Sequence, residues 1–224
     1  MPVAKFICGH ASGMQLAKAF ERLVLARVEQ LPRSPRGRPL KLADADALAL
    51  MFKVLRTGMQ WREVDATVCH TTIFRRFHAW HAQGVFEDAY RKALRTYAKL
   101  RASRFYCVDS SYVRNRHCQQ GTGKNHTDRG RKALKLSIVT DDAGVVFAAR
   151  LDPGNRPDVT LLEATLRDPL ARLERLPLYA DRGYDSRHNR NVCRAAGLYD
   201  RIFRRKTKTC RRTNARRGSR ASRS

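Results

Sequence analysis

The chain has 224 residues, of which 42% are hydrophobic, so it has enough apolar side chains to form one large domain or two small ones. Its 46 Lys and Arg residues against 20 Asp and Glu give a formal net charge of +26. A charge of this size indicates a polyanionic partner, because phosphate binding releases the cations condensed on nucleic acid. The sequence has no run of 18 apolar residues and no secretory signal pattern at its start, which argues against a spanning helix and against export. Nucleic acid is therefore the expected partner.

The six cysteines are scattered through the chain without the paired spacing of a zinc ribbon. Because the chain is neither short nor rich in cysteine, we expect reduced thiols rather than disulfides. This fits a cytoplasmic protein associated with a bacterial nucleoid, or a nuclear protein in a eukaryotic host. Cys69 with His78 and His81 offers three zinc ligands but lacks a fourth, so a zinc site is the weaker alternative.

The first 36 residues predict a helix followed by a basic connection. Apolar residues recur at helical spacing from Leu16 to Val24, and Pro32 lies beyond the end of this pattern. Residues 32–39 mix proline, glycine and arginine, which is typical of an arm that follows DNA phosphates, or equally of a solvated linker.

Residues 37–100 predict a helical DNA-binding region. A helix is expected from Leu42 to Arg56, with Gly58 as its break, and a further helix whose N-cap oxygens come from Thr71 and Thr72. A last helix spans residues 85–100. Three short helices, of which the third carries an arginine pair near its start, are typical of a helix-turn-helix. We therefore predict that these arginines contact the DNA groove: Arg75 and Arg76.

Residues 101–210 change to the pattern of a mixed α/β sheet. A strand is expected at residues 105–108, a hairpin at 133–151 and a helix at 159–173, followed by a strand at 178–180, a helix at 187–196 and a strand at 199–203. This order fits an RNase H-like sheet with flanking helices, and other α/β folds as well.

The end of the chain is strongly basic. Eleven Lys or Arg residues and no acid lie between Arg201 and Ser224, and residues 211–224 are expected to form a disordered tail. Three residues at its start are predicted to contact DNA phosphates: Arg204, Arg205 and Lys206.

Two aspartates occupy similar positions, since each directly follows a short apolar strand: Asp109 after FYCV and Asp181 after PLYA. Strand ends in open α/β sheets hold side chains where ligands bind. Paired carboxylates there offer the hard oxygen ligands that Mg²⁺ prefers, and two such ions assist the cleavage of a phosphodiester. The alternative is that each aspartate only caps a local turn, Asp109 with Ser110 and Ser111, and Asp181 with Gly183. Their matching positions in so basic a chain favour the metal site.

Several strings resemble the DDE transposases of bacterial insertion sequences. In the second half these are VDSSYVR (108–114), TGKNHTDRGRK (122–132), GVVFAARLDPGNRPDVTLL (144–162) and LYADRGYDS (178–186). In the first half, GRPLKLADADALALMFKVLRTGMQWREV (37–64) and IFRRFHAWHAQGVFE (73–87) resemble the helical DNA-binding region of the same family. The strings are weak singly and specific in combination.

The resemblance implies an RNase H-like fold, Mg²⁺ or Mn²⁺ as cofactor, and cutting and joining of double-stranded DNA at terminal inverted repeats. Carried over by position, Asp109 and Asp181 are the first two members of the family's catalytic, metal-binding triad. Family members generally assemble as dimers on paired DNA ends, so a homodimer is implied too.

This sequence departs from the family pattern in its last part. The third member of the triad is a glutamate on a later helix, but the last glutamate here is Glu174, and only Asp185 and Asp200 follow Asp181. We therefore expect a C-terminally truncated chain, transposition reduced by several orders of magnitude, and an uncovered apolar face on the sheet. A smaller departure is Pro157, where relatives usually carry histidine.

Three functions remain open from the sequence. The chain is a metal-dependent transposase impaired by the lost carboxylate, or a catalytically dead remnant that occupies or represses transposon ends. The third alternative, a nonspecific coating protein, predicts no helix-turn-helix, and the ordered apolar pattern of residues 42–100 argues against it.

Overall fold

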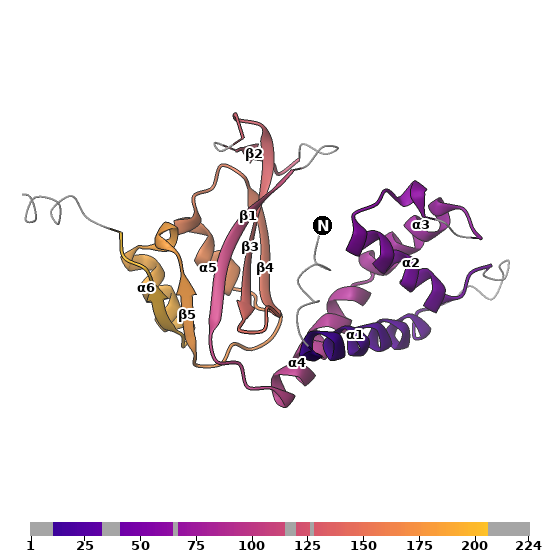
Figure 1. Cartoon of the computed structure of the whole chain (residues 1–224), viewed down its shortest axis with the longest axis horizontal. Coiled ribbons are helices and arrows are strands. Elements are labelled where there is room, and N and C mark those ends of the chain that lie inside the picture. Colours follow the sequence, from indigo (N-terminus) through magenta and orange to yellow (C-terminus); the bar gives the residue numbers. More distant parts are fainter. Residues whose placement is uncertain (1–10, 33–40, 65–66, 115–119, 126–127, 206–224) are drawn as a thin grey trace, which may run out of the picture.

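The computed structural model describes residues 11–32, 41–64, 67–114, 120–125 and 128–205, which form a helical unit followed by a sheet unit (Figure 1). The described helical segments of the first unit are α1 (Ala11–Glu29), α2 (Asp44–Thr57), the 3₁₀ turn η2 (Trp61–Glu63), α3 (His70–Ala82) and α4 (Val85–Leu100). Within the described ranges, no helix has both the length and the apolar character needed to cross a membrane.

The helical unit has its own apolar core, as the helical spacing predicts. Met51, Ile73 and Val85 come from three different helices and are almost completely buried in one cluster. Gly58 ends α2 in the left-handed conformation, with φ of 71°, and its amide donates to the carbonyl of Val54, which confirms the predicted break. The predicted threonine cap of α3 is wrong, because the helix begins at His70 and Cys69 occupies the N-cap position.

The sheet unit is a mixed α/β structure, as predicted. Its strands are β1 (Tyr106–Arg114), β2 (Gly123–Lys124), β3 (Lys132–Asp141), β4 (Val146–Pro153), β5 (Pro177–Ala180) and β6 (Tyr199–Ile202). The connecting helices and 3₁₀ turns are η3 (Asp158–Thr160), α5 (Leu161–Leu166), η4 (Arg182–Tyr184) and α6 (Arg187–Ala195). The sheet order is β2-β3-β1-β5-β6, and β4 also pairs with β3. Strand β1 is antiparallel to β3 and parallel to β5, which in turn is parallel to β6.

Two predicted boundaries in this unit are wrong for identifiable reasons. Strand β1 does not end at Asp109 but continues to Arg114, because residues 109–114 pair with β3 even though their side chains are mostly polar. The helix predicted over residues 159–173 stops at Leu166. Pro169 has no amide hydrogen and disfavours helical backbone at Asp168, so the helix cannot run through this pair.

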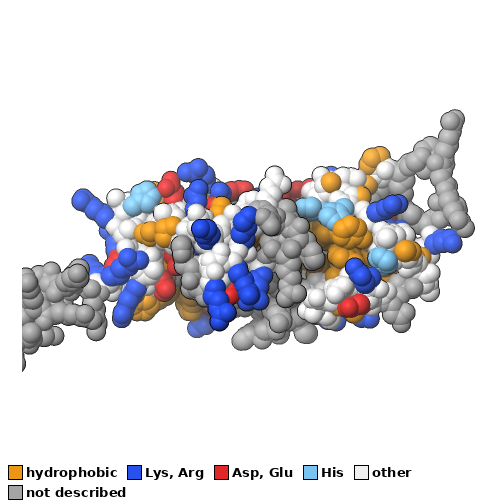
Figure 2. Space-filling view, turned by 90° about the horizontal axis from the view of Figure 1, so that it is seen from above, with side chains coloured by type: hydrophobic (Ala, Val, Ile, Leu, Met, Phe, Trp, Pro, Cys, Tyr) orange, Lys and Arg blue, Asp and Glu red, His pale blue; other side chains and the backbone are white. Residues whose placement is uncertain are grey.

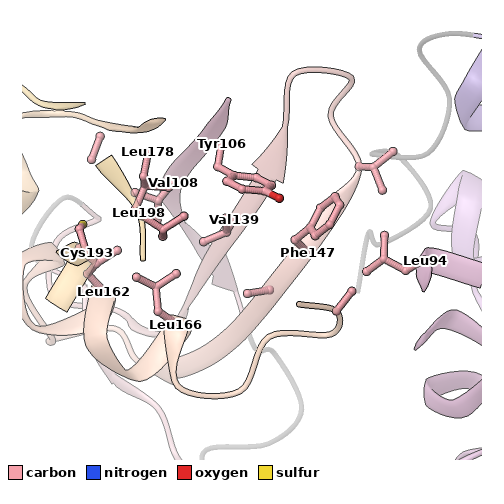
Figure 3. Close-up of a cluster of buried hydrophobic side chains, with 14 of the residues drawn as sticks. Leu94, Tyr106, Val108, Val139, Phe147, Leu162, Leu166, Leu178, Cys193 and Leu198 are labelled. Atoms are coloured by element: carbon pink, nitrogen blue, oxygen red, sulfur yellow. The ribbon is translucent and has the colours of Figure 1, made fainter. Parts of the chain in front are cut away.

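A second apolar core lies between the sheet and helices α5 and α6 (Figure 3). Leu162 of α5 and Cys193 of α6 are fully buried against Val108, Val139 and Leu178 of the strands. The same cluster continues past Phe147 to Leu94 of α4, which joins the two units (Figure 3).

Polar contacts fix helix α4 to the turn between β3 and β4. The hydroxyl of Tyr97 donates to Asp141 Oδ2 at 2.7 Å, and Arg101 lies 3.0 Å from Asp142 Oδ2. Both aspartate side chains are fully buried, so these pairs satisfy charges that would otherwise be costly to remove from water.

Candidate active site

Asp109 and Asp181 lie on neighbouring strands at the same level of the sheet. Strands β1 and β5 are parallel, with Tyr106 opposite Leu178 and Cys107 opposite Tyr179. Continuing this register by two residues brings Asp109 opposite Asp181, and neighbouring strands are only about 4.8 Å apart. Both aspartates are exposed, whereas the preceding residues in each strand point into the core. The register thus supports the expectation that the two carboxylates lie close together, although Asp181 directly follows β5 and the printed pairing ends at Cys107 and Tyr179.

Each carboxylate is oriented by a backbone amide close to it in sequence. The amide of Ser110 donates to Asp109 Oδ1 at 2.7 Å, and the amide of Gly183 donates to Asp181 Oδ1 at 2.7 Å. Asp181 is also the N-cap of η4, so the turn cap with Gly183, which was the alternative role of Asp181, is present. Because each contact involves Oδ1, neither cap prevents the second oxygen, Oδ2, from binding a cation.

A third aspartate, Asp158 in η3, contacts Ser110 after Asp109 and lies beside Gly183 after Asp181. It was not identified from the sequence. Its Oδ1 accepts a hydrogen bond from the hydroxyl of Ser110 and lies 2.5 Å from Lys135 Nζ. The Lys135 side chain is only 6% exposed, on β3, and its Nζ also lies 5.0 Å from the centre of the Tyr112 ring. The sequence offered one signal, a lysine within an otherwise apolar strand pattern.

The turn after Asp181 is held by arginines. Arg190 lies 2.8 Å from Asp185 and 2.7 Å from Asp200, and both ion pairs are largely screened from water. Hydrogen bonds from the Arg205 amide and from Arg190 hold the pKa of Asp185 below its usual range. Asp185 and Asp200, the two acids that follow Asp181, are therefore used in ion pairs.

Tyr184 lies beneath the same turn. It is 1% exposed, and its hydroxyl has no hydrogen bond partner of good geometry in the described part of the chain. Burial raises the pKa of Tyr184 to about 12, and the negative charges of Asp158 and Asp109 act in the same direction. The hydroxyl therefore stays protonated at neutral pH, close to the aspartates.

The fold and this pair of aspartates agree with the comparisons with known proteins. A family model described as "Transposase DDE domain" matches residues 101–223, more than half of the chain. The chain belongs to this family. A second family model, "Putative transposase of IS4/5 family", matches residues 22–90. These matches confirm the predicted family and its RNase H-like fold.

One similar protein is the "Putative transposase for insertion sequence element IS402" of Burkholderia cepacia. It is 38% identical over 116 residues, which cover 48% of this chain and 53% of that protein. The chain thus spans about half the length of this relative.

Asp109 and Asp181 are the candidate metal ligands of this site. Among the described residues, no group of three or more His, Cys, Asp or Glu side chains could hold a metal ion. Cys69, His78 and His81 therefore do not form such a group, and His78 packs against Phe74, with ring centres 4.3 Å apart. The carboxylates of Asp109 and Asp181 fit a divalent cation in their chemistry, and water or DNA phosphate would have to complete its ligands.

The thiols of the described part are free, as expected from the scattered spacing: Cys69, Cys107 and Cys193. Burial raises the pKa of Cys193 to about 11, so this thiol is a core group rather than a reactive one.

The predicted DNA contacts fall into two groups. Arg75 and Arg204 are exposed, so they stay predictions. Arg76 has another role, because its guanidinium donates to the carbonyl of Leu42 and to Asp44, and its side chain is only 11% exposed. The prediction of a groove contact at Arg76 is therefore replaced by an ion pair that joins α3 to the start of α2.

The remaining two predicted phosphate contacts also differ from each other. The Arg205 guanidinium donates to the carbonyls of Arg182 at 2.8 Å and Gly183 at 3.1 Å, so it stabilises the turn after Asp181 while remaining exposed. Lys206 lies outside the described residues.

Exposed apolar side chains are present on both units. Figure 2 shows hydrophobic and histidine side chains exposed on the helical unit and Lys and Arg side chains over the sheet unit. In the sheet unit, Tyr179 on β5 is 40% exposed and Phe203, directly after β6, is 61% exposed.

Proposed function

We propose that this chain binds the terminal inverted repeats of a transposon and cleaves and joins DNA strands there with Mg²⁺ or Mn²⁺. The observation that carries the proposal is the parallel pairing of β1 with β5, whose register, continued by two residues, brings Asp109 opposite Asp181, in a chain of the DDE transposase family. The net charge of +26 supports a DNA partner.

The residues of the site have separate tasks in this proposal. Asp109 and Asp181 bind the cation through their outer oxygens, while the amides of Ser110 and Gly183 keep each carboxylate in place. A divalent ion there would polarise the phosphodiester and favour the attacking and leaving oxygens. Arg75 and Arg204 contact DNA, with Lys206 as a further phosphate contact.

The proposed site has two carboxylates in the given sequence. This sequence contains no glutamate after Glu174, and Asp185 and Asp200 are engaged with Arg190. A cation held by these two carboxylates alone would support slower cleavage than one held by three, because electrostatic stabilisation is a large part of phosphoryl transfer catalysis.

A second candidate function is occupation of transposon ends without cleavage. It is favoured by the folded helical unit, together with the finding that the described residues contain no group of three or more side chains that could hold a metal ion. Dimers on paired ends fit either function.

One experiment separates these functions. The protein is incubated with a labelled duplex that carries the ends of its own element, or with a scrambled duplex, with and without Mg²⁺, and strand breaks are mapped on a sequencing gel. Nicks that need Mg²⁺ and vanish in Asp109→Asn and Asp181→Asn, but persist in the surface control Asp46→Asn, support the transposase. An end-specific complex without nicks supports the second function, and equal affinity for both duplexes excludes both.

A further inference from the structure

We propose that Asp158 is a positioning residue for the aspartate pair, and that Lys135 neutralises its charge. The inference rests on the proposed function, since it concerns how Asp109 and Asp181 are prepared to bind a cation. Asp158 belongs to η3, which lies between β4 and α5 in the chain and is thus separate from the segments that carry Asp109 and Asp181.

Asp158 contacts the segment of Asp109 through Ser110. The hydroxyl of Ser110 donates to Asp158 Oδ1, and the amide of the same residue donates to Asp109 Oδ1 at 2.7 Å. Ser110 is thus held from one side by Asp158 and holds Asp109 on the other. Loss of the first contact would free the serine side chain and loosen the second.

Asp158 contacts the segment of Asp181 at Gly183. A Cβ atom on Gly183 would lie 3.1 Å from Asp158 Oδ2 and 2.8 Å from Asp181 Oδ1. Asp158 Oδ2 and Asp181 Oδ1 are therefore both close to the same point beside Gly183. Asp158 packs against the turn whose amide orients Asp181, so one side chain connects both halves of the site.

The charge of Asp158 is matched inside the protein. Lys135 Nζ lies 2.5 Å from Asp158 Oδ1 and also donates to the carbonyl of Arg156 at 3.3 Å. An ammonium group that is 6% exposed requires such partners, because an unpaired buried charge is strongly destabilising. With Asp158 neutralised by Lys135, the aspartate pair alone carries the two negative charges that match a divalent cation.

This arrangement assigns Asp158 the role of holding rather than ligating. A hydrogen bond acceptor at its Oδ1 position is what Ser110 requires, and an asparagine retains that acceptor. A metal ligand, in contrast, requires the negative charge. Asp158→Asn alone would also leave the Lys135 ammonium without its counter-charge, so it is combined with Lys135→Met, and the two roles give opposite results for this double variant.

The test uses the full chain and two readouts. The first is the amide chemical shifts of Ser110 and Gly183 in the metal-free protein, and the second is Mn²⁺ affinity by calorimetry. Ser110→Ala removes the donor without unpairing Lys135, Asp158→Ala removes the acceptor, and Ser111→Ala on the same strand is the matched control. We expect Ser110→Ala and Asp158→Ala to bind Mn²⁺ about tenfold more weakly, because residues behind metal ligands commonly contribute this much.

The conservative variant decides the role. Asp158→Asn with Lys135→Met is expected to keep the Gly183 amide shift and to bind Mn²⁺ within about threefold of the wild type, well short of the loss typical of a disrupted support. The proposal is overturned if this double variant loses as much affinity as Ser110→Ala, or if Ser110→Ala changes neither readout. If the wild-type chain binds no Mn²⁺, the proposed function fails, and the two amide shifts still decide the positioning role on their own.

Discussion

Two neighbouring arginines on α3 should respond to substitution in opposite ways. Arg76 is 11% exposed, and its Nη1 donates to the Leu42 carbonyl at 3.0 Å and to Asp44 Oδ1 at 3.3 Å. Arg75 precedes it on the helix and is exposed. The sequence assigned both to DNA, whereas the structure assigns Arg76 to the fold.

The contacts of Arg76 set the expected magnitude. Arg76→Ala removes an ion pair and a charged hydrogen bond from a largely buried setting, and hydrogen bonds to charged groups contribute about 1.5–3 kcal/mol each. We expect the free energy of unfolding to fall by about 2 kcal/mol, which lowers the melting temperature by roughly 4–8 °C in a chain of this size. Arg75→Ala should change stability by less than about 0.5 kcal/mol.

DNA binding should show the reverse order. Loss of a phosphate contact at Arg75 lowers affinity for duplex DNA and reduces the salt dependence of log K by about 0.9. Melting curves by circular dichroism and fluorescence anisotropy over a salt series measure both properties. If Arg76→Ala melts like the wild type and reduces the salt dependence instead, the ion pair with Asp44 does not form and the reasoning fails.

Two further perturbations have defined outcomes. Gly183→Ala places a Cβ 2.8 Å from Asp181 Oδ1 and 3.1 Å from Asp158 Oδ2, so the Asp181 carboxylate must move, and Mn²⁺ affinity in calorimetry should fall about tenfold; unchanged affinity would show that this carboxylate is not held by its turn. Burial raises the pKa of Tyr97 and of Tyr184 to about 12, from an ordinary value of 10.0. Each tyrosine keeps its proton to a higher pH in the folded than in the unfolded state. Its full contribution to the free energy of unfolding is therefore present below pH 10 and is lost as the pH rises towards 12, by on the order of 2 kcal/mol for each tyrosine. Urea denaturation between those pH values should show this decline, and a smaller one in Tyr97→Phe; a flat profile contradicts it.

Local sequence signals predicted most of the sheet unit. The turn residues Asp141-Asp142-Ala143-Gly144 predicted the hairpin. Gly144 adopts the left-handed conformation that such a turn requires, with φ of 79°. A short apolar run predicted β5, Gly197 predicted the end of α6, and a last strand was expected at residues 199–203, where β6 lies. In each case the deciding residues are close together in the chain.

The two wrong boundaries have different causes, one long-range and one local. The polar stretch of β1 after Asp109 is a strand because β3 supplies partners along its whole length, which no local pattern reveals. The end of α5 at Leu166 was available from the Asp168-Pro169 pair, but apolar periodicity was given more weight. Local pattern and long-range pairing thus give different boundaries.

The candidate site was predictable in part for the same reason. The matching strand positions of Asp109 and Asp181 predicted that they would lie close together, and the parallel register of β1 and β5 supports this prediction. The roles of Asp158 and Lys135 depend on a contact across 23 positions of the chain, between a 3₁₀ turn and the middle of a strand. The resemblance to a family motif did not identify that contact.

The central claim, that Asp109 and Asp181 share one divalent cation, is tested most directly by the stoichiometry and affinity of Mn²⁺ binding to the full chain. The account predicts one bound Mn²⁺ whose affinity falls at least about tenfold in Asp109→Asn and equally in Asp181→Asn, since either change removes a charged ligand. Asp46→Asn, an exposed acid on α2, should bind Mn²⁺ like the wild type. Wild-type affinity in either site variant would contradict the shared site.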